Sequence, residues 1–179
     1  VLGLKWSDID FEKKTMHIQR TLHYAKVKED EPCHFFFTTP KTETSNREIP
    51  LLPETEAILR RVRKKQLRNR MLHASQWNVQ SPFDDMVFTT QQGIPIRYGD
   101  VNRTIKSVIL KANLQEEELA KFENREPFIL KPFSPHCFRH TFVTRCKMNG
   151  VPYETIQPYV GHSDKEMTAY YNHDKPEID

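Results

Sequence analysis

The chain has 179 residues, a formal net charge of +3 and a charged fraction of 28%. This length fits one domain, and no apolar run is long enough for a membrane-spanning helix. Cys33, Cys137 and Cys146 are odd in number and lack the spacing of a metal site, so a disulfide framework is not expected and a reducing cytosol fits. Residues 1–75 carry a net charge of +5 and residues 76–179 one of −2, and a basic half favours a polyanionic partner.

The first third of the chain predicts a small sheet. Residues 1–4 are apolar, and we interpret them as the end of a helix that begins upstream, because the chain opens inside this stretch. Residues 15–24 alternate apolar and polar side chains, which predicts a strand. Residues 33–39 and 47–51 predict a second and a third strand. We therefore expect a three-stranded antiparallel sheet, with Lys41 at or near its second connection.

A basic helix is expected to follow the sheet. Pro53 suits a first helical turn, and Glu54 complements the helix dipole there. The buried face is expected to consist of Ile58, Leu59 and Val62. The rest of the helix is crowded with basic residues, among them Arg60, Arg61, Arg63, Lys64, Lys65 and Arg68. Two interpretations are open. The face is either simply solvated, or it contacts DNA phosphates and gives sequence-independent, salt-sensitive affinity.

Four further helices are expected in the second half of the chain, the last of which is capped by Ser163 and Asp164 and carries Tyr171. The apolar pattern of residues 98–112 predicts a helix, whereas the charge-rich residues 115–132 suggest a loop or short helix. A second helix is expected from Pro135 to a stop at Gly150. A third, short helix should run from residue 151 to residue 160 and end at Gly161, with a kink or early end at its internal proline.

The start of the helix after Pro135 has the composition of an anion site. His136 and Arg139 lie three residues apart and should share one helix face. A guanidinium can bind two phosphate oxygens, an imidazole can donate another hydrogen bond, and the helix N-terminus adds positive potential. His136 and His140 also have the four-residue spacing of zinc helices, but Cys137 stands where such motifs carry Glu, so no metal site is predicted.

Apolar side chains recur along the same helix. Phe138, Phe142 and Cys146 follow one another every four residues. We expect this stripe to be the buried face of the helix.

Four motifs, in this order, resemble those of tyrosine recombinases, the phage-type and conjugative-transposon integrases. Residues 2–10, Leu-Gly-Leu-Lys-Trp-Ser-Asp-Ile-Asp, resemble the first catalytic block, and residues 40–51 resemble the β-hairpin that carries a catalytic lysine. His-x-x-Arg-His-Thr-Phe-x-Thr at residues 136–144 leads to Gly-His-Ser-Asp at 161–164. The last motif, Tyr-x-His, lies at 171–173, and its Tyr171 comes nine residues after His162.

The resemblance implies an α+β fold, mostly helical with a small three-stranded antiparallel sheet. It implies one catalytic domain over residues 1–179, with DNA-binding domains and the first catalytic arginine upstream of Val1. The implied function is site-specific DNA recombination, the integration or excision of a mobile element through a 3′-phosphotyrosine intermediate. Two alternatives remain, a non-catalytic DNA-binding module and an enzyme like type IB topoisomerases.

The resemblance also implies a role for each site residue. Tyr171 would be the nucleophile and Lys41 the acid that protonates the leaving 5′-oxygen. Arg139 would hold the non-bridging oxygens, while His136 moves a proton. His162 would stabilise the transition state by hydrogen bonding.

The remaining implications concern partners and setting. His173, two residues beyond the nucleophile, would support the site. No metal or other cofactor is needed for this chemistry. The partner would be double-stranded DNA, with the protein assembled on it as an oligomer, a tetramer in the family. The setting would be a bacterial or phage-encoded protein in the cytoplasm, associated with the nucleoid and not with a membrane.

Overall fold

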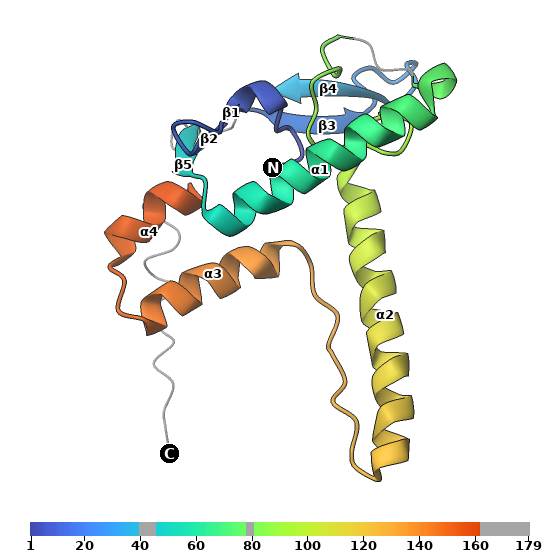
Figure 1. The fold of residues 1–179 in the computed structure, drawn as a ribbon, viewed down its shortest axis with the longest axis vertical. Coiled ribbons are helices and arrows are strands. Elements are labelled where there is room, and N and C mark those ends of the chain that lie inside the picture. The colour runs from blue at the N-terminus through green and yellow to red at the C-terminus, as the bar shows by residue number, and fades with distance from the viewer. Residues whose placement is uncertain (40–45, 78–80, 162–179) are drawn as a thin grey trace. The chain divides into compact units, whose positions relative to one another are not determined.

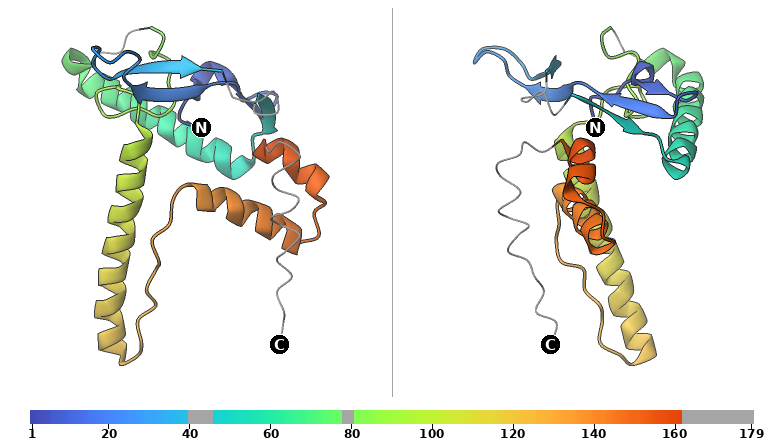
Figure 2. Two further views of the ribbon diagram at one scale, coloured as in Figure 1. Left: turned by 180° about the vertical axis from the view of Figure 1, so that it is seen from behind. Right: turned by 90° about the vertical axis from the view of Figure 1, so that its left-hand side faces the viewer.

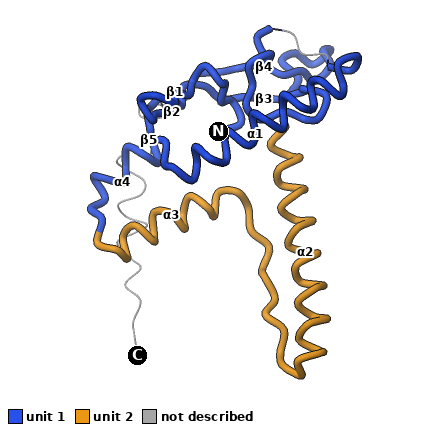
Figure 3. Tube along the Cα trace, viewed as in Figure 1, with its two compact units in different colours: residues 1–95, 151–179 blue, residues 96–150 orange. Residues whose placement is uncertain are grey.

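The structure is a computed structural model that describes residues 1–39, 46–77 and 81–161 (Figure 1). It divides into two compact units. Unit 1 comprises Val1–Pro95 with Val151–Asp179, and unit 2 comprises Ile96–Gly150 (Figure 3). The described residues hold four α-helices and two small antiparallel sheets, with more helix than strand, so the predicted α+β class is confirmed.

Unit 1 contains both sheets. The first has three strands in the order β1 (Ile9–Asp10), β2 (Thr15–Ile18) and β5 (Arg47–Pro50). The second pairs β3 (Thr21–Ala25) with β4 (His34–Thr38). All pairs are antiparallel. The three-stranded sheet was therefore predicted correctly, but its membership was not.

The expected strand at residues 15–24 is divided between the two sheets. It breaks at Gln19 and Arg20, whose side chains both donate hydrogen bonds to Asp8. The first half, β2, pairs with β5, and the second half, β3, pairs with the aromatic strand β4. Since β4 and β5 belong to different sheets, the expected pairing of residues 33–39 within the three-stranded sheet is wrong. Lys41 lies outside the described residues.

The start of the chain also differs from its prediction. Residues 1–4 form a turn and not the end of a helix, and a single 3₁₀ turn, η1 (Trp6–Asp8), follows. The Asp8 carboxylate accepts a hydrogen bond of 2.8 Å from the backbone N–H of Lys5, which fixes the start of that turn. This capping holds the first motif in a tight loop in front of β1.

Helix α1 (Pro53–Leu72) covers the sheets, and both views in Figure 2 place the strands along one side of it. Its proline lies at the start and its first turn is acidic, as predicted. Leu59 is buried and Val62 is partly buried against the core, but Ile58 is 50% exposed, so its expected place on the buried face is wrong. That core consists of Leu4, Ile9, Leu51, Leu59 and Val87, with Trp6, Phe11, Met16, Ile18, Val62 and Phe88 packed around it. One face of the helix therefore forms part of the hydrophobic core of unit 1.

In unit 2, helix α2 (Tyr98–Glu123) is longer than expected. Residues 115–123 continue the helix, because their Gln, Glu, Leu, Ala and Lys side chains are good helix formers. The helix ends at Asn124, whose φ of 52° is left-handed. Two side chains of α2 then bind the backbone of the returning chain. Asn113 exchanges hydrogen bonds of 2.9 and 3.0 Å with Leu130, and Glu116 accepts one of 2.9 Å from Phe128.

The last two described helices begin and end where the sequence predicted. Helix α3 (His136–Met148) follows Pro135 and stops before Gly150, whose φ of 73° is left-handed. Helix α4 (Tyr153–Val160) belongs to unit 1 and ends at Gly161, whose φ is 64°. It continues through Pro158 and packs on β5, where Nε of Arg47 donates to the carbonyl oxygen of Tyr159 at 3.1 Å. No helix in the described part of the chain is long and apolar enough to cross a membrane.

Candidate functional site

The first turn of α3 presents His136 and Arg139. Pro135 has helical backbone angles, φ −53° and ψ −24°, and its carbonyl oxygen accepts a hydrogen bond of 3.2 Å from the N–H of Phe138. His136 is exposed, and Arg139, one turn further on, is half-buried. The two residues therefore share the first turn of a helix, as their spacing predicted, and the positive end of the helix dipole favours an anion there.

His136 is in contact with a second histidine. The rings of His136 and His140 lie 4.5 Å apart between centroids and are almost perpendicular, at 83°. The pKa of His136 is lowered from 6.5, first because neighbouring groups remove water from the ring and then because of the positive charges of His140 and Arg139. The neutral form of His136 is thereby favoured near pH 7. A neutral imidazole can accept a proton.

The buried face of α3 differs from the prediction. Phe138 and Phe142 are 60% and 46% exposed, whereas Val143 is fully buried. The half-buried residues of the helix include Arg139, His140, Cys146 and Lys147, which lie three or four positions from Val143 on the same face. The aromatic stripe was therefore wrong, although Cys146 is partly covered. Among the described residues, Phe138 instead contacts the aromatic ring of Phe133, edge-on at 5.5 Å.

The six basic residues of α1 that were predicted to bind DNA divide into two groups. All six are exposed. Arg60 forms an ion pair of 2.8 Å with Glu56 and lies over the ring of Phe11, while Arg63 lies over the ring of Trp6 at 5.3 Å. The other four have no partner among the described residues. These four are Arg61, Lys64, Lys65 and Arg68, and we call them the α1 basic face.

The α1 basic face is a single surface of the helix. Its members follow one another at steps of three, one and three residues, the spacing of one helical face. The buried seam that contains Leu59, Val62 and Gln66 lies elsewhere around the helix axis. Four cations on one side of a straight helix form a surface that can follow a phosphate backbone.

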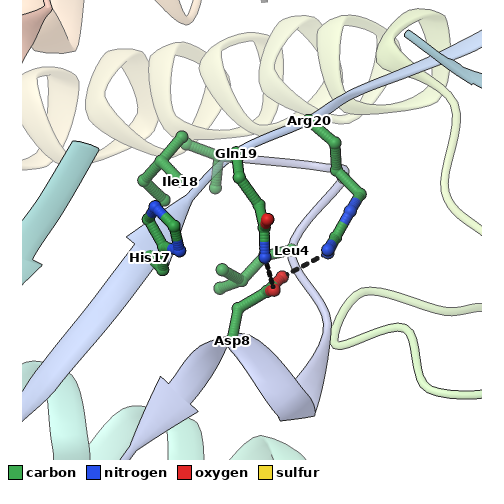
Figure 4. A pocket seen from close by; sticks show the side chains of 8 residues that line it. Leu4, Asp8, His17, Ile18, Gln19 and Arg20 are labelled. Atoms are coloured by element: carbon green, nitrogen blue, oxygen red, sulfur yellow. Dashed lines mark hydrogen bonds and ion pairs between the residues drawn. The ribbon is translucent and has the colours of Figure 1, made fainter. Parts of the chain in front are cut away.

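The first motif contains a structural site that the sequence did not indicate. Asp8 is 7% exposed, and its carboxylate accepts hydrogen bonds of 2.7 Å from Gln19 and 2.5 Å from Arg20 (Figure 4). Gly3 lies beside this cluster, and a Cβ there would stand 2.9 Å from the carbonyl oxygen of Arg20. Asp8 and Arg20 are twelve positions apart, which corresponds to no helix or strand spacing, so no local pattern signals the pair.

The structure brings together only part of the predicted site. His136 and Arg139 share one turn, whereas Lys41, His162, Tyr171 and His173 lie outside the described residues. Among the residues that are described, no group of three or more His, Cys, Asp or Glu side chains could hold a metal ion. The geometry in hand is therefore a candidate phosphate-binding turn and, in unit 1, a basic helix face.

Comparison with known proteins gives these features a context. The family model described as the phage integrase family matches residues 1–177. A XerC-like tyrosine recombinase of Caldanaerobacter subterraneus subsp. tengcongensis is 29% identical over 97% of the chain, and the transposase of transposon Tn916 from Enterococcus faecalis is 26% identical over 96%. The chain spans 41% and 37% of the length of these two relatives.

Solved structures agree with the sequence comparison. The integrase of transposon Tn1549 in complex with a circular intermediate DNA is 25% identical, with a TM-score of 0.73 over 95% of this chain and 48% of that one. The same integrase in complex with transposon right end DNA is 24% identical, with a TM-score of 0.72 over 97% of this chain and 49% of that one. The fold described above is therefore that of an integrase.

Proposed function

Since this chain belongs to the phage integrase family, we propose that it is the catalytic domain of a site-specific tyrosine recombinase that breaks and rejoins the DNA of a mobile element. The observation that carries the proposal is the pairing of His136 with Arg139 in the first turn of α3. The likeness to recombinases and transposases of mobile elements supports it. The proposed substrate is double-stranded DNA, because the similar Tn1549 structures are complexes with DNA.

The proposed chemistry is two successive transfers of one phosphoryl group. The phenolic oxygen of Tyr171 attacks the scissile phosphorus and loses its proton, and the bond to the 5′-oxygen breaks. Lys41 donates the proton that this leaving oxygen needs. The strand is then held as a 3′-phosphotyrosine, so the energy of the broken bond is kept for rejoining. No metal or other cofactor takes part in these steps.

The proposed role of α3 follows from charge. In the transition state, negative charge grows on the non-bridging phosphate oxygens, and Arg139 lies in the first turn of a helix whose dipole also favours that charge. His136, held mostly neutral, would accept the proton of the nucleophile. His162 would hydrogen-bond the phosphate, and His173 would support the nucleophile's surroundings.

We assign binding of the duplex backbone to the α1 basic face. Its four cations are exposed and point away from the core, and such contacts hold DNA in register without reading its sequence. Assembly of several protomers on DNA, a tetramer in the proposed working complex, belongs to the same hypothesis. Strand exchange needs two duplexes and therefore more than one active site.

The experiment that tests the proposal is covalent trapping. The full natural polypeptide that contains residues 1–179 is incubated with a nicked duplex copied from the DNA that flanks its gene, and denaturing gels detect protein joined to DNA. Tyr171→Phe should remove the adduct and leave duplex binding within about twofold, because only the attacking oxygen is lost. Tyr170→Phe is the matched control and should still form the adduct.

Other outcomes separate the alternatives. An adduct that persists in Tyr171→Phe would refute the assignment of the nucleophile. Tight DNA binding without any adduct in the unmodified protein would identify a non-catalytic DNA-binding module. Relaxation of a supercoiled plasmid without exchange between two duplexes would indicate an enzyme like type IB topoisomerases.

A further inference from the structure

The predicted mechanism uses His136 and Arg139 but gives no role to His140. His140 lies one turn after His136 and its ring meets the His136 ring edge-to-face, at 4.5 Å and 83°. His140 is half-buried and His136 is exposed, so the inner ring supports the outer one. Edge-to-face contacts are the preferred geometry of aromatic pairs, and they restrict how the supported ring can rotate.

We propose that His140 is a positioning residue that holds the imidazole of His136 in one orientation beside Arg139. This inference rests on the proposed function and adds a specific residue to it. An exposed histidine at a helix start otherwise samples several rotamers. A proton acceptor works only when its nitrogen is within hydrogen-bond reach of the proton that it takes, so a fixed ring increases the fraction of productive encounters.

The same contact has an electrostatic consequence. Among the described residues, the charged or titratable groups that act on His136 are Arg139 and His140, both from α3 itself. Protonation of His140 places a second positive charge against the His136 ring and opposes its protonation. A ring at position 140 that cannot be protonated should therefore keep the orientation of His136 and shift its titration towards higher pH. Packing and charge can thus be separated by choice of variant.

The test compares His140→Phe with His140→Ala in the full natural polypeptide. The first keeps an aromatic ring and removes the charge, and the second removes both. Met148→Ala, at an exposed position of the same helix outside the motif, is the matched control. Adduct formation with the nicked flanking duplex is measured from pH 5.5 to pH 8.5, and the ring protons of His136 are titrated by NMR in the same proteins.

We expect His140→Ala to slow adduct formation about tenfold with DNA binding unchanged, a fraction of what a positioned acid–base group contributes. His140→Phe should retain most of the rate, while the acid limb of its pH profile and the NMR titration of His136 both move to higher pH. Met148→Ala should match the unmodified protein in every respect. Circular dichroism measures whether each variant is folded. If His140→Ala does not fold, the proposal is judged by whether the His136 titration in His140→Phe moves to higher pH.

The proposal is overturned if the two His140 variants lose the same fraction of the rate. It is also overturned if both the rate and the His136 titration stay unchanged in the two variants. His136→Gln separates this failure from failure of the proposed function. If His136→Gln forms adducts at the normal rate, the proton-transfer role of His136 is wrong, and positioning for that role falls with it. The NMR titration reports the ring contact directly, because it needs no DNA and no catalysis.

Discussion

The indole Nε1 of Trp6 donates a hydrogen bond of 2.7 Å to the side-chain oxygen of Gln66, a residue 60 positions further along the chain. The amide nitrogen of Gln66 donates in turn to the carbonyl oxygen of Met86 at 2.8 Å and to the hydroxyl of Thr89 at 3.0 Å. One amide on the inner seam of α1 therefore joins the first motif to the buried stretch that begins at Met86. Every polar atom of this side chain has a partner.

We predict that Gln66→Leu destabilises the protein by about 1–3 kcal/mol, because Trp6 Nε1–H and the Met86 carbonyl lose their partner inside the protein. Urea denaturation followed by tryptophan fluorescence measures the change. Gln76→Leu, at an exposed glutamine of the 3₁₀ turn η3 (Ala74–Gln76), is the control and should be close to neutral. A Gln66→Leu protein as stable as the unmodified one would mean that water replaces both bonds at no cost.

The buried ion pair of the first motif yields a second prediction. The Asp8 side chain is 3% exposed and that of Arg20 is 21% exposed. Asp8→Ala removes the acceptor of Lys5 N–H, Gln19 and Arg20 together, so we expect a loss of about 3 kcal/mol, as for breaking a buried pair. Thermal unfolding measures it. Glu31→Ala, whose pair with Lys28 is exposed at 3.3 Å, should cost less than about 1 kcal/mol.

A double variant tests whether the two residues act as a pair. If Asp8→Ala and Arg20→Gln are coupled, their combined effect should be smaller than the sum of the single effects by about 1 kcal/mol or more. Strict additivity would instead indicate that Asp8 acts through Lys5 and Gln19 alone.

These pairs also mark where sequence reasoning ends. The positions of α1, α3 and α4 followed from proline, glycine and the period of the apolar side chains, which are local signals. The division of the sheet was not predictable, because it coincides with the hydrogen bonds of Gln19 and Arg20 to Asp8, contacts made by tertiary structure. The same limit applies to the pairing of Trp6 with Gln66.

Within the candidate site, the spacing of His136 and Arg139 was sufficient to place them in one turn, because a helix fixes residues three apart. His136 and His140 lie four residues apart, a spacing that is visible in the sequence. That spacing is better known from zinc-binding helices than from a ring that supports another ring. The buried stripe of α3 was missed for another reason. Hydrophobicity alone favoured Phe138 and Phe142 as the buried residues, whereas Val143 is the residue of this helix that is buried.

The carboxylate that binds the chain after α2 should respond to acid. The Arg125 guanidinium, and after it the N–H of Phe128, lower the pKa of Glu116 from 4.5 to about 2. Because the folded pKa is lowered, the carboxylate contributes stability above pH 4.5, and this contribution is lost as the pH falls from 4.5 through about 2. NMR of the side-chain carboxyl carbon should give a midpoint near 2 for Glu116.

Arg125→Gln provides the comparison for Glu116. Without the guanidinium, the midpoint should move back towards 4.5, and the backbone signals of Phe128 should change over the same pH range. A midpoint that stays near 2 in Arg125→Gln would assign the shift to the backbone hydrogen bond instead. A midpoint near 4.5 in the unmodified protein would mean that the pair does not form in solution.

The α1 basic face should determine how DNA binding depends on salt. Each cation that neutralises a phosphate contributes about 0.9 to the slope of log K against log salt concentration. We therefore expect the combined change Arg61→Gln, Lys64→Gln and Lys65→Gln to reduce that slope by about 2–3. Fluorescence anisotropy with a labelled duplex measures the slope between low and physiological salt.

A control of equal charge decides whether the location of these cations matters. Lys106→Gln, Lys111→Gln and Lys121→Gln remove the same charge from exposed positions of α2 and should change the slope by less than about 1. Arg60→Gln and Arg63→Gln should also have small effects on the slope, because these guanidinium groups are already engaged with Glu56 and with the Trp6 ring. If the α2 triple variant lowers the slope as much as the α1 triple variant, the long-range field of the whole protein explains the affinity, because direct phosphate contact at one helix face would depend on position.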